Sequence, residues 1–506
     1  MRYTILDGYT DEPSGLGVPP YLGVYPRYIA GRILAEDPSA KITYLTIDDM
    51  RALEKGLNKK DAKELKEKIK TNISIYNLTG NDVSETIENS DVMICIVGVQ
   101  TPGKYLSARP ATLSEMTRLT KKFSIKKILT GPAISSFGTQ VMGGKFAENI
   151  SKFDLDGYEL EEEDTFNDYS KIKEFAIKGS VIASQFPKPF IAEIELSRGC
   201  FRNINCSFCT EPLADCQSFR EQSDIVAEMK SLYDTGARNF RLGRATCIYS
   251  YKNNSSNEIE ILFKSIWKAC PKIEVLHIDN ANPAMVITEN GIKITKLIVK
   301  YCTEGNIAAF GCETFDPDVV KLNDLNSTPE TSMKAIQIVN KYGAERGVNG
   351  LPKFLPGINI LFGLIGESKK THKCNMEFLT KVVDEGLLLR RINIRQVVPF
   401  PGTKLFKEAK NKFLKKNQRY YYRWRDDIRQ KIDVPMLRSV FTEGMIIKNV
   451  LLEIYDGNTT FGRQIATYPV VIGIKGRHPL RTWHDVEIVG YMKRSLTGKI
   501  VNEKKK

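Results

Sequence analysis

The sequence predicts an α/β protein of three domains: a Rossmann-like parallel sheet, a partial (β/α)6 barrel and a small antiparallel β-barrel. Apolar strands alternate with amphipathic helices over residues 1–150 and again over 188–406, which is the pattern of parallel sheets covered by helices. Short strands separated by turns follow over residues 437–500. A chain of 506 residues has room for about three such domains, each with its own core.

Residues 1–150 form the first predicted domain. The expected strands are 3–6, 42–47, 92–99 and 127–130, and the expected helices are 22–34, 50–69 and 113–123. Parallel sheets of this kind bind ligands at the carboxyl ends of their strands, where the Gly-rich turns 15–20 and 101–104 would lie. The first turn does not match the dinucleotide-binding fingerprint, so an NAD site is only weakly supported.

A polar segment, residues 151–187, is predicted as a linker to the second domain. Six strand-helix repeats are expected over residues 188–406. Their first helix, 223–235, carries apolar residues at helical spacing and stops before a glycine. A later helix begins at Thr328-Pro329, where an N-cap residue is followed by proline at the first helical position.

Three cysteines, Cys200, Cys206 and Cys209, follow the first apolar strand of these repeats. Three thiolates can hold three irons of a [4Fe-4S] cluster and leave the fourth iron open to a substrate or cosubstrate. A structural zinc site is the alternative, but zinc needs four ligands, and the nearest further cysteine, Cys216, lies seven residues on. The sequence therefore favours a cluster. The remaining scattered cysteines have no ligand-like spacing and are expected in the core.

The strand, the Arg-Gly pair before Cys200 and the aromatic Phe208 before Cys209 resemble the radical S-adenosylmethionine superfamily. Five residues separate the first two cysteines here, where three are commonest in that superfamily. The resemblance implies that the open iron binds S-adenosylmethionine and that one electron cleaves it to a 5′-deoxyadenosyl radical. It also implies a reductase or a ferredoxin as electron donor.

Five later strand ends follow the order of that superfamily: residues 241–244, 278–282, 310–314, 362–368 and 399–403. The last three resemble methylthiotransferase-type barrels, whereas 241–244 departs from the Gly-Gly-Glu type turn of the relatives. The resemblance implies contacts with the bound cofactor from four residues: Phe208, Gly243, Glu313 and Gly363. Glycine lets the backbone approach a ligand closely, Glu313 could accept hydrogen bonds from ribose hydroxyls, and Phe208 could cover the adenine face. The alternatives are an ion pair inside the barrel for Glu313 and simple core packing for Phe208.

The first domain resembles the cobalamin-binding-like or methylthiotransferase-like domain that precedes many of these barrels. A base-off cobalamin site needs a histidine ligand, and all four histidines lie outside this domain, at positions 277, 372, 478 and 484. Cobalamin is therefore not expected. Methylthiotransferases hold a second cluster with three cysteines in this domain, whereas this sequence offers only Cys95. Methylthiolation by that route is disfavoured.

A basic, aromatic-rich helical segment is predicted over residues 407–436. Between Lys404 and Lys431, eleven Lys or Arg residues stand against three acids. Cations for phosphates and aromatic faces for unpaired bases are the combination that binds single-stranded RNA. The alternative is an exposed amphipathic helix whose aromatic residues dock on the barrel. The candidate RNA-binding residues of this segment are Lys415, Lys416, Arg419, Tyr421, Arg423 and Trp424.

Residues 437–500 are predicted to form the small β-barrel, with strands near 444–453, 460–464, 470–473, 486–489 and 495–498. They resemble the TRAM domain, which contacts RNA in methylthiotransferases and several RNA methyltransferases. Its Gly462-Arg463 turn adds Arg463 to the candidate RNA-binding residues. The lysine-rich tail, 501–506, is expected to be disordered.

Composition places the protein in a reducing compartment without a membrane span. No apolar run reaches the ~18 residues of a span, no leader segment is evident, and ten cysteines without paired spacing do not form a disulfide framework. A cytoplasmic location is expected. The net charge of +14 would attract an anionic partner such as nucleic acid.

The whole chain most resembles archaeal iron-sulfur oxidoreductases related to methylthiotransferases. The preferred hypothesis is a radical enzyme that modifies RNA, with tRNA as substrate and partner. A radical enzyme acting on a lipid, peptide or small metabolite is the first alternative, and a non-catalytic iron-sulfur redox or scaffold protein is the second.

Overall fold

The fold was analysed in a computed structural model of the full chain. It describes residues 1–9, 21–56, 78–98, 110–131, 133–134, 150–162, 168–214 and 217–501. These residues form two compact units. Unit 1 comprises Met1–Leu196, Arg220–Phe240 and Ser265–Ile273, and unit 2 comprises Ser197–Phe219, Arg241–Lys264 and Glu274–Lys506. None of the described helices is both long and apolar enough to cross a bilayer.

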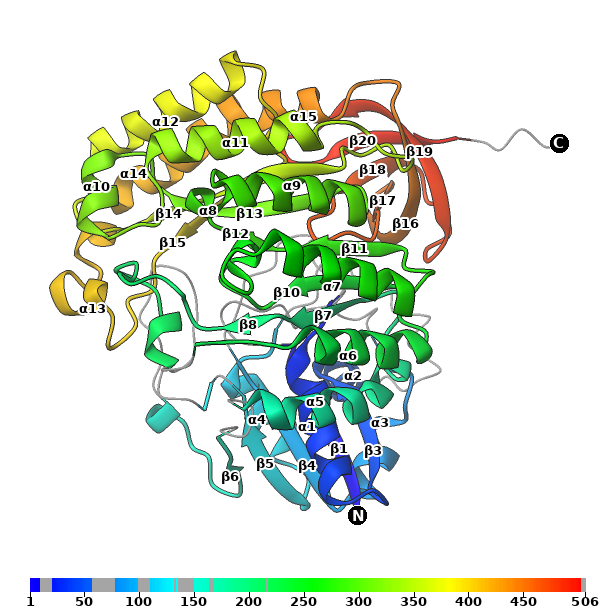
Figure 1. The fold of residues 1–506 in the computed structure, drawn as a ribbon. Helices are drawn as coiled ribbons and strands as arrows, with labels where there is room; N and C mark the ends of the chain where they lie inside the picture. Colours follow the sequence, from blue (N-terminus) through cyan, green and yellow to red (C-terminus); the bar gives the residue numbers. More distant parts are fainter. Residues whose placement is uncertain are drawn as a thin grey trace. The chain divides into compact units, whose positions relative to one another are not determined.

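Unit 1 is built on a five-stranded parallel sheet (Figure 1) with the order β3-β1-β4-β5-β6. Its strands are β1 (Arg2–Asp7), β3 (Lys41–Thr46), β4 (Val92–Ile96), β5 (Lys126–Thr130) and β6 (Glu159–Leu160). Every residue of β4 is buried. A central strand buried on both faces carries an unbroken apolar run, which explains why β4 was visible in the sequence.

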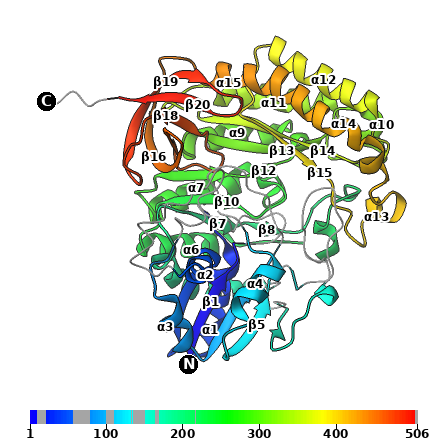
Figure 2. The same cartoon turned by 180° about the vertical axis from the view of Figure 1, so that it is seen from behind.

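Helices cover both faces of this sheet (Figures 1 and 2). They are α1 (Val24–Glu36), α2 (Ile47–Glu54), α3 (Val83–Glu88), α4 (Leu113–Thr120) and α5 (Tyr169–Lys178). On one face, α2, α3 and α4 share an apolar core with the strands, in which Met50, Ile87 and Met116 lie buried. On the other, α1 packs against α5. Gly31 permits that packing, because a Cβ there would lie 1.8 Å from the Phe175 carbonyl oxygen.

A buried ionic network ties α1 to the rest of unit 1. Arg27 of α1 and Arg220 both pair with Glu228 of α6 (Gln222–Asp234), and all three side chains are fully buried. Removing one member of a buried ion network leaves an uncompensated charge in the interior, which is strongly destabilising. Both guanidinium groups therefore depend on the shared carboxylate of Glu228. The short strand β2 (Tyr21–Leu22) pairs in parallel with β7 (Ile191–Glu195) beside this network.

Some predictions for the N-terminal part need revision. The segment 151–187 was predicted as a linker, but it contributes β6 and α5, whose polar composition reflects a short exposed edge strand and a half-exposed helix. The predicted helix 50–69 begins earlier, at Ile47, where Thr46 and Asp49 form a capping box. Its second half and the Gly-rich turns 15–20 and 101–104 lie outside the described residues.

Unit 2 contains a four-stranded parallel sheet of order β12-β13-β14-β15. The strands are β12 (Asn280–Ala281), β13 (Asn306–Glu313), β14 (Phe354–Phe362) and β15 (Arg391–Gln396). Figure 1 shows α9 (Glu289–Tyr301), α11 (Pro329–Gly343) and α12 (Lys369–Asp384) lying along this sheet. Toward the end of β14 burial alternates, with Ile358, Ile360 and Phe362 buried and the residues between them only partly so.

Six strand-helix steps follow one another from β7 to residue 408, as the sequence predicted. Beyond the elements already given, the strands of this region are β10 (Asn239–Gly243) and β11 (Val275–Ile278). The further helices are α7 (Ser256–Ala269), α8 (Pro283–Val286), α10 (Pro317–Leu322) and α13 (Lys404–Glu408). The closure of all six strands into one partial barrel stays a prediction.

The C-terminal strands form a closed five-stranded barrel of order β16-β17-β18-β20-β19. They are β16 (Ile446–Asp456), β17 (Thr459–Arg463), β18 (Ile472–Lys475), β19 (Trp483–Tyr491) and β20 (Leu496–Ile500). The predicted barrel is therefore confirmed, but β18 and β20 run parallel. A closed ring with an odd number of strands cannot be antiparallel throughout, so one parallel pair is unavoidable. Its core continues into Leu355 of β14.

The basic segment forms α14 (Lys412–Ile428), which continues through a π-helical turn (Arg429–Asp433) into α15 (Val434–Val440). One side of α14 docks on the domain through Trp424, which is 2% exposed. The Trp424 ring stacks on His372 with ring centroids 5.2 Å apart and on Phe362 at 6.0 Å. Trp424 is therefore the core anchor of α14, the buried side chain that attaches the helix to the rest of the domain.

Replacing Trp424 with alanine should lower the free energy of unfolding by about 3–5 kcal/mol, the usual cost of removing a buried aromatic ring. Tyr422→Ala is the matched control, since Tyr422 is 65% exposed on the same helix, and it should cost no more than about 0.5 kcal/mol. Urea unfolding followed by circular dichroism measures both. Equal effects of the two substitutions would show that α14 does not depend on Trp424 for docking.

Candidate functional site

The three cysteines lie on one loop whose two ends are held together. The strand β8 (Ser197–Arg198) before the loop pairs with β9 (Ser218–Phe219) after it, in an antiparallel ribbon. The rings of Phe201 and Phe219 stack with centroids 4.1 Å apart. The Gln217 side chain also donates to the Cys200 carbonyl oxygen at 2.6 Å. Ribbon, ring stack and hydrogen bond therefore confine the cysteine loop.

All three thiols of the cysteine loop are partly buried. Burial raises the pKa of Cys206 to about 11 and that of Cys209 to about 12, and the other cysteines of the loop add to both rises. Three thiolates so close together need a compensating positive charge, which a metal centre supplies. Arg202 gives part of it, because Nη1 donates to Cys206 Sγ at 2.9 Å. The donor set thus fits a metal centre held by thiolates.

The ligands of a zinc ion and those of an iron-sulfur cluster are arranged differently. Among the residues that the structure describes, no three His, Cys, Asp or Glu side chains converge as ligands of one metal ion. A structural zinc ion needs four ligands converging in this way. A cluster instead takes each thiolate on a separate iron.

Asn323, buried at the end of α10, joins the cysteine loop to two other segments. Its Oδ1 accepts hydrogen bonds from Ser207 Oγ at 2.6 Å and from the Ile365 amide at 3.0 Å. Its Nδ2 donates to the Ile365 carbonyl at 2.9 Å, and its own carbonyl accepts from the Ser207 amide at 2.9 Å. Sequence reasoning noted Asn323 only as part of the motif that follows residues 310–314 and gave it no role of its own. An Asn at the C-terminal end of a helix is too common a signal to identify such a junction.

Glu313 stands at the end of β13 in an unusual backbone conformation. Its φ is +64°, and the register of β13 shifts between Phe310 and Glu313. A non-glycine residue in the left-handed region at a bulge is typical of functional positions, where the surroundings enforce the strain. Burial raises the pKa of Glu313 to about 8, and the positive charge of Arg395 opposes that rise. The sequence analysis selected Glu313 as a cofactor-binding candidate, and its positive φ at a β-bulge is consistent with a functional position.

Gly363 is required by packing as well as by backbone conformation. Its φ is +101°, and a Cβ would lie 2.4 Å from Leu414 of α14. The Gly363 amide donates to Glu367 Oε2 at 2.7 Å, and Asn417 of α14 donates to Glu367 Oε1 at 3.1 Å. The approach of α14 therefore accounts for the missing side chain at Gly363. Its predicted cofactor contact stays a prediction.

The other two predicted cofactor residues lie in dense surroundings. Phe208 is partly buried and packs, together with Cys206, against an apolar cluster that includes Leu364, Val397 and Leu405. Gly243 is the buried last residue of β10. Phe208 thus sits beside the cysteines, while part of its ring contributes to the core, as the alternative interpretation expected.

The predicted RNA-binding residues divide into exposed and buried sets. Four cations on the outer side of α14 are exposed: Lys415, Lys416, Arg419 and Arg423. Tyr421 is half-buried against Phe362. Two predictions need correction. Trp424 has no surface for a base, because it is the core anchor of α14, and Arg463 is 4% exposed in an ion pair with Glu453 at 2.8 Å.

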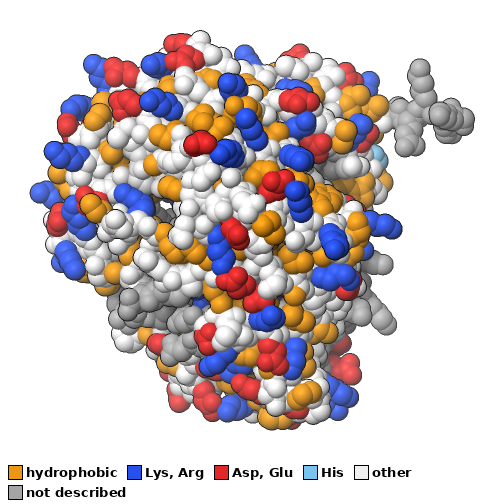
Figure 3. Space-filling view, viewed as in Figure 1, with side chains coloured by type: hydrophobic (Ala, Val, Ile, Leu, Met, Phe, Trp, Pro, Cys, Tyr) orange, Lys and Arg blue, Asp and Glu red, His pale blue; other side chains and the backbone are white. Residues whose placement is uncertain are grey.

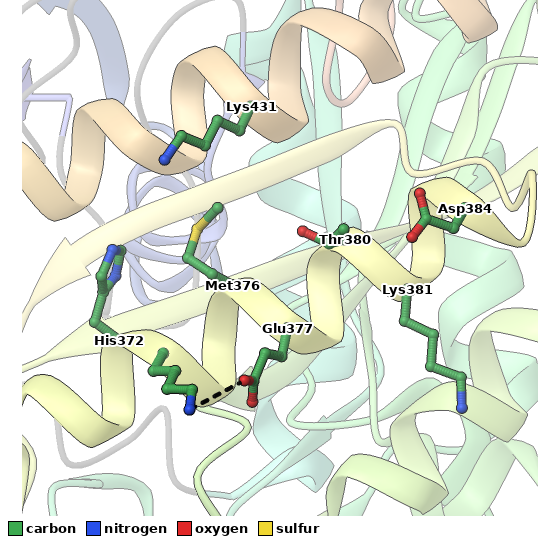
Figure 4. A pocket seen from close by; sticks show the side chains of 8 residues that line it. His372, Met376, Glu377, Thr380, Lys381, Asp384 and Lys431 are labelled. Atoms are coloured by element: carbon green, nitrogen blue, oxygen red, sulfur yellow. Dashed lines mark ion pairs between the residues drawn. The ribbon is translucent and has the colours of Figure 1, made fainter.

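A separate groove of about 520 Å³ runs along α12 (Figure 4). It is lined by His372, Met376, Thr380 and Asp384, which recur every four residues on one side of the helix, with Lys431 of the π-helical turn opposite. Figure 3 shows cationic and acidic side chains interspersed over the face that carries α11 and α12. None of the predicted site residues lines this groove.

Comparison of the whole chain with known proteins places it in a family. No family model matches the chain. Uncharacterized protein MJ0274 of Methanocaldococcus jannaschii is 40% identical over 544 residues, which cover 100% of this chain and 94% of that protein. An uncharacterized protein of Archaeoglobus fulgidus is 36% identical over 514 residues, covering 98% and 89% respectively. The chain belongs to the same family as these two archaeal proteins, and neither description names an activity.

The solved structures that resemble the chain include radical S-adenosylmethionine enzymes. The methyltransferase TsrM from Kitasatospora setae, with cobalamin and a [4Fe-4S] cluster, has a TM-score of 0.46 at 12% identity, covering 80% of this chain and 73% of its own. The cobalamin-dependent enzyme OxsB reaches 0.46 at 11% identity, covering 84% and 56%. Likeness this weak carries no inference about the chemistry of this chain. The expectation against cobalamin gains no support here, and the relations to methylthiotransferases and TRAM domains stay predictions.

Substituting Cys206 with alanine should abolish cluster binding, because two thiolates hold a [4Fe-4S] cluster poorly. The measurement is iron and sulfide content after anaerobic reconstitution. Cys374→Ala is the control, since Cys374 is a half-buried thiol of α12 outside the cysteine loop, and it should retain the wild-type content. Full iron content in the Cys206 variant would refute its assignment as a ligand.

Asn323→Ala should loosen the cysteine loop without removing a thiol. The Ile365 amide loses its acceptor, so its hydrogen exchange should accelerate about tenfold or more, and the reconstituted protein should release iron faster to a chelator. Asn340→Ala is matched, because Asn340 bridges α11 to Leu388 through the same pair of hydrogen bonds. That variant should accelerate exchange at Leu388 only. Unchanged iron release after Asn323→Ala would contradict the proposed junction.

Proposed function

We propose that the protein is a radical S-adenosylmethionine enzyme whose Cys200, Cys206 and Cys209 hold a [4Fe-4S] cluster. The observation that carries this proposal is the confined loop of three partly buried thiols, with Arg202 donating to Cys206. A bound cluster would pass one electron to S-adenosylmethionine, which cleaves to methionine and a 5′-deoxyadenosyl radical. The electron would come from a ferredoxin or a reductase.

The residues around the loop would bind and orient the cosubstrate. Glu313 presents its carboxyl group at a strand end, where it can accept hydrogen bonds from ribose hydroxyls. Phe208 lies one residue before Cys209 and offers the part of its ring that is not buried to the adenine. Asn323 holds the turn after Gly363 against the cysteine loop through its hydrogen bonds to Ile365 and Ser207. The rigid support favours a fixed geometry between cosubstrate and substrate.

The substrate that we propose is RNA, and tRNA in particular. Lys415, Lys416, Arg419 and Arg423 form an exposed cationic row on α14, and the exposed ring of Tyr422 lies on the same helix. Phosphates bind to such cations and unpaired bases stack on such rings. The closed C-terminal barrel is a second surface of a kind that binds nucleic acid.

The experiment that tests the chemistry is anaerobic reconstitution, reduction with dithionite and chromatography for 5′-deoxyadenosine, with and without total tRNA. We expect 5′-deoxyadenosine that increases with tRNA, together with a changed nucleoside in the tRNA digest. If the amount of 5′-deoxyadenosine is the same with and without tRNA, the radical chemistry is supported and the substrate is a lipid, a peptide or a small metabolite instead of RNA. No cleavage would favour a redox or scaffold protein.

Neutralising the cationic row of α14 tests the RNA surface directly. The variant replaces four cations with alanine: Lys415, Lys416, Arg419 and Arg423. The affinity for tRNA should then fall less steeply with salt, with the magnitude of the log–log slope smaller by about three, because each phosphate contact contributes roughly 0.7–0.9. The matched control replaces four exposed lysines of α9 and α11: Lys293, Lys296, Lys300 and Lys334. Filter binding over a series of salt concentrations measures both. Equal slopes for the two variants would exclude α14 as the RNA surface.

A further inference from the structure

One face of β14 and β15 carries a polar row that leads toward the cysteine loop. Successive side chains of a strand point to opposite faces, so Asn359 and Leu361 share a face. The parallel register places Asn393 beside Asn359 and Arg395 beside Leu361. Leu361 packs in the same apolar cluster as Cys206 and Phe208. The row of Asn359, Asn393 and Arg395 therefore lies on the face that adjoins the candidate site.

The row is connected by hydrogen bonds that orient the guanidinium. The carboxamides of Asn359 and Asn393 lie 3.1 Å apart. With its oxygen turned toward the guanidinium, Asn393 accepts from Arg395 Nε at 2.7 Å and from Nη2 at 3.2 Å. These contacts occupy one edge of the guanidinium. The remaining N–H donors stay available for a ligand.

No carboxylate among the residues that the structure describes forms an ion pair with Arg395. Its side chain is exposed near the end of β15. Glu313 is near enough for their charges to interact, yet burial disfavours ionisation of that carboxyl group. An oriented guanidinium with free donors is the usual means of binding a phosphate or carboxylate.

An unsatisfied polar group lies close to Glu313, whose charge interacts with that of Arg395. A Cβ added to Gly311 of β13 would meet Glu313 Oε1 at 3.3 Å and Asn326 Nδ2 at 3.4 Å, so these two side chains approach the same backbone position. Asn326 Oδ1 is buried and accepts no hydrogen bond from the described residues. A buried acceptor without a donor is costly and indicates a ligand or water that supplies one. The hydroxyl and amino groups of a nucleotide are donors of that kind.

We propose that Arg395 binds a phosphate group of the RNA substrate, and that Asn393 and Asn359 position it for that contact. The inference rests on the proposed function, because it places the substrate beside the cysteine loop. One nucleotide of the RNA then lies along β14 and β15. Its phosphate contacts Arg395, and one of its donor groups reaches Asn326 Oδ1.

The test measures the affinity of reconstituted protein, saturated with S-adenosylmethionine, for a fluorescein-labelled oligouridylate decamer at several salt concentrations. Arg395→Ala should weaken binding about tenfold and reduce the salt slope by about one, as the loss of one phosphate contact predicts. Arg395→Lys should keep the slope and lose part of the affinity, because the charge remains without the Asn393 contacts. Asn393→Ala should weaken binding less and leave the slope unchanged.

Arg2→Ala, a substitution of an exposed arginine at the start of β1, is the charge-matched control and should change neither quantity. Equilibrium dialysis with labelled S-adenosylmethionine is the second arm. We expect Arg395→Ala to bind it as the wild type does. Loss of that binding would assign Arg395 to the cosubstrate carboxylate and overturn the inference, as would an unchanged salt slope.

The two proposals can fail separately. A wild-type protein that cleaves S-adenosylmethionine but does not bind the decamer refutes the role of Arg395 and leaves the radical chemistry intact. A protein that binds the decamer through Arg395 but forms no 5′-deoxyadenosine refutes the proposed chemistry and keeps the phosphate site.

Discussion

The candidate site depends on the hydrogen bonds of one buried side chain, Asn323. Through it the cysteine loop is fixed to the end of α10 and to the turn that follows β14. The Leu405 amide adds a third attachment, since it donates to the Ser207 carbonyl at 2.7 Å. Segments separated by more than a hundred residues therefore meet at Ser207. Because a buried amide without its partner costs roughly 1–3 kcal/mol, these contacts hold the loop as a unit.

The second constraint is the unusual backbone at strand ends. Glu313 occupies the left-handed region despite having a side chain, and Gly363 occupies a conformation that only glycine adopts without strain. Glu313 is the last residue of β13 and Gly363 directly follows β14, so the two residues lie at neighbouring strand ends. Strain such as that at Glu313 persists only where the surrounding packing enforces it. At Gly363, Leu414 and the Glu367–Asn417 hydrogen bond hold α14 against the turn.

The helix α14 therefore combines two roles that the sequence presented as alternatives. Its inner side anchors the helix through Trp424 and supports the Gly363 turn, while its outer side presents an exposed cationic row. Sequence composition alone could not separate these sides, because aromatic and basic residues are interleaved along the segment. The stacking of Trp424 on His372 and Phe362 is a tertiary contact between residues more than fifty positions apart.

Sequence periodicity determined the parallel sheet of unit 1, the succession of strands and helices and the five C-terminal strands. Local signals suffice there, because apolar runs, helical spacing and turn residues act over a few positions. The three cysteines and Glu313 were also visible in the sequence, since their spacing and order are local properties.

Only the tertiary structure decided the rest. It placed β6 and α5 in the predicted linker, buried Trp424 and Arg463, and made one strand pair of the barrel parallel. It also joined Asn323 to the cysteine loop and set Arg395 beside Leu361. The physical reason is that burial, ring closure and hydrogen bonding join residues far apart in the chain, and no local pattern records which partners will meet.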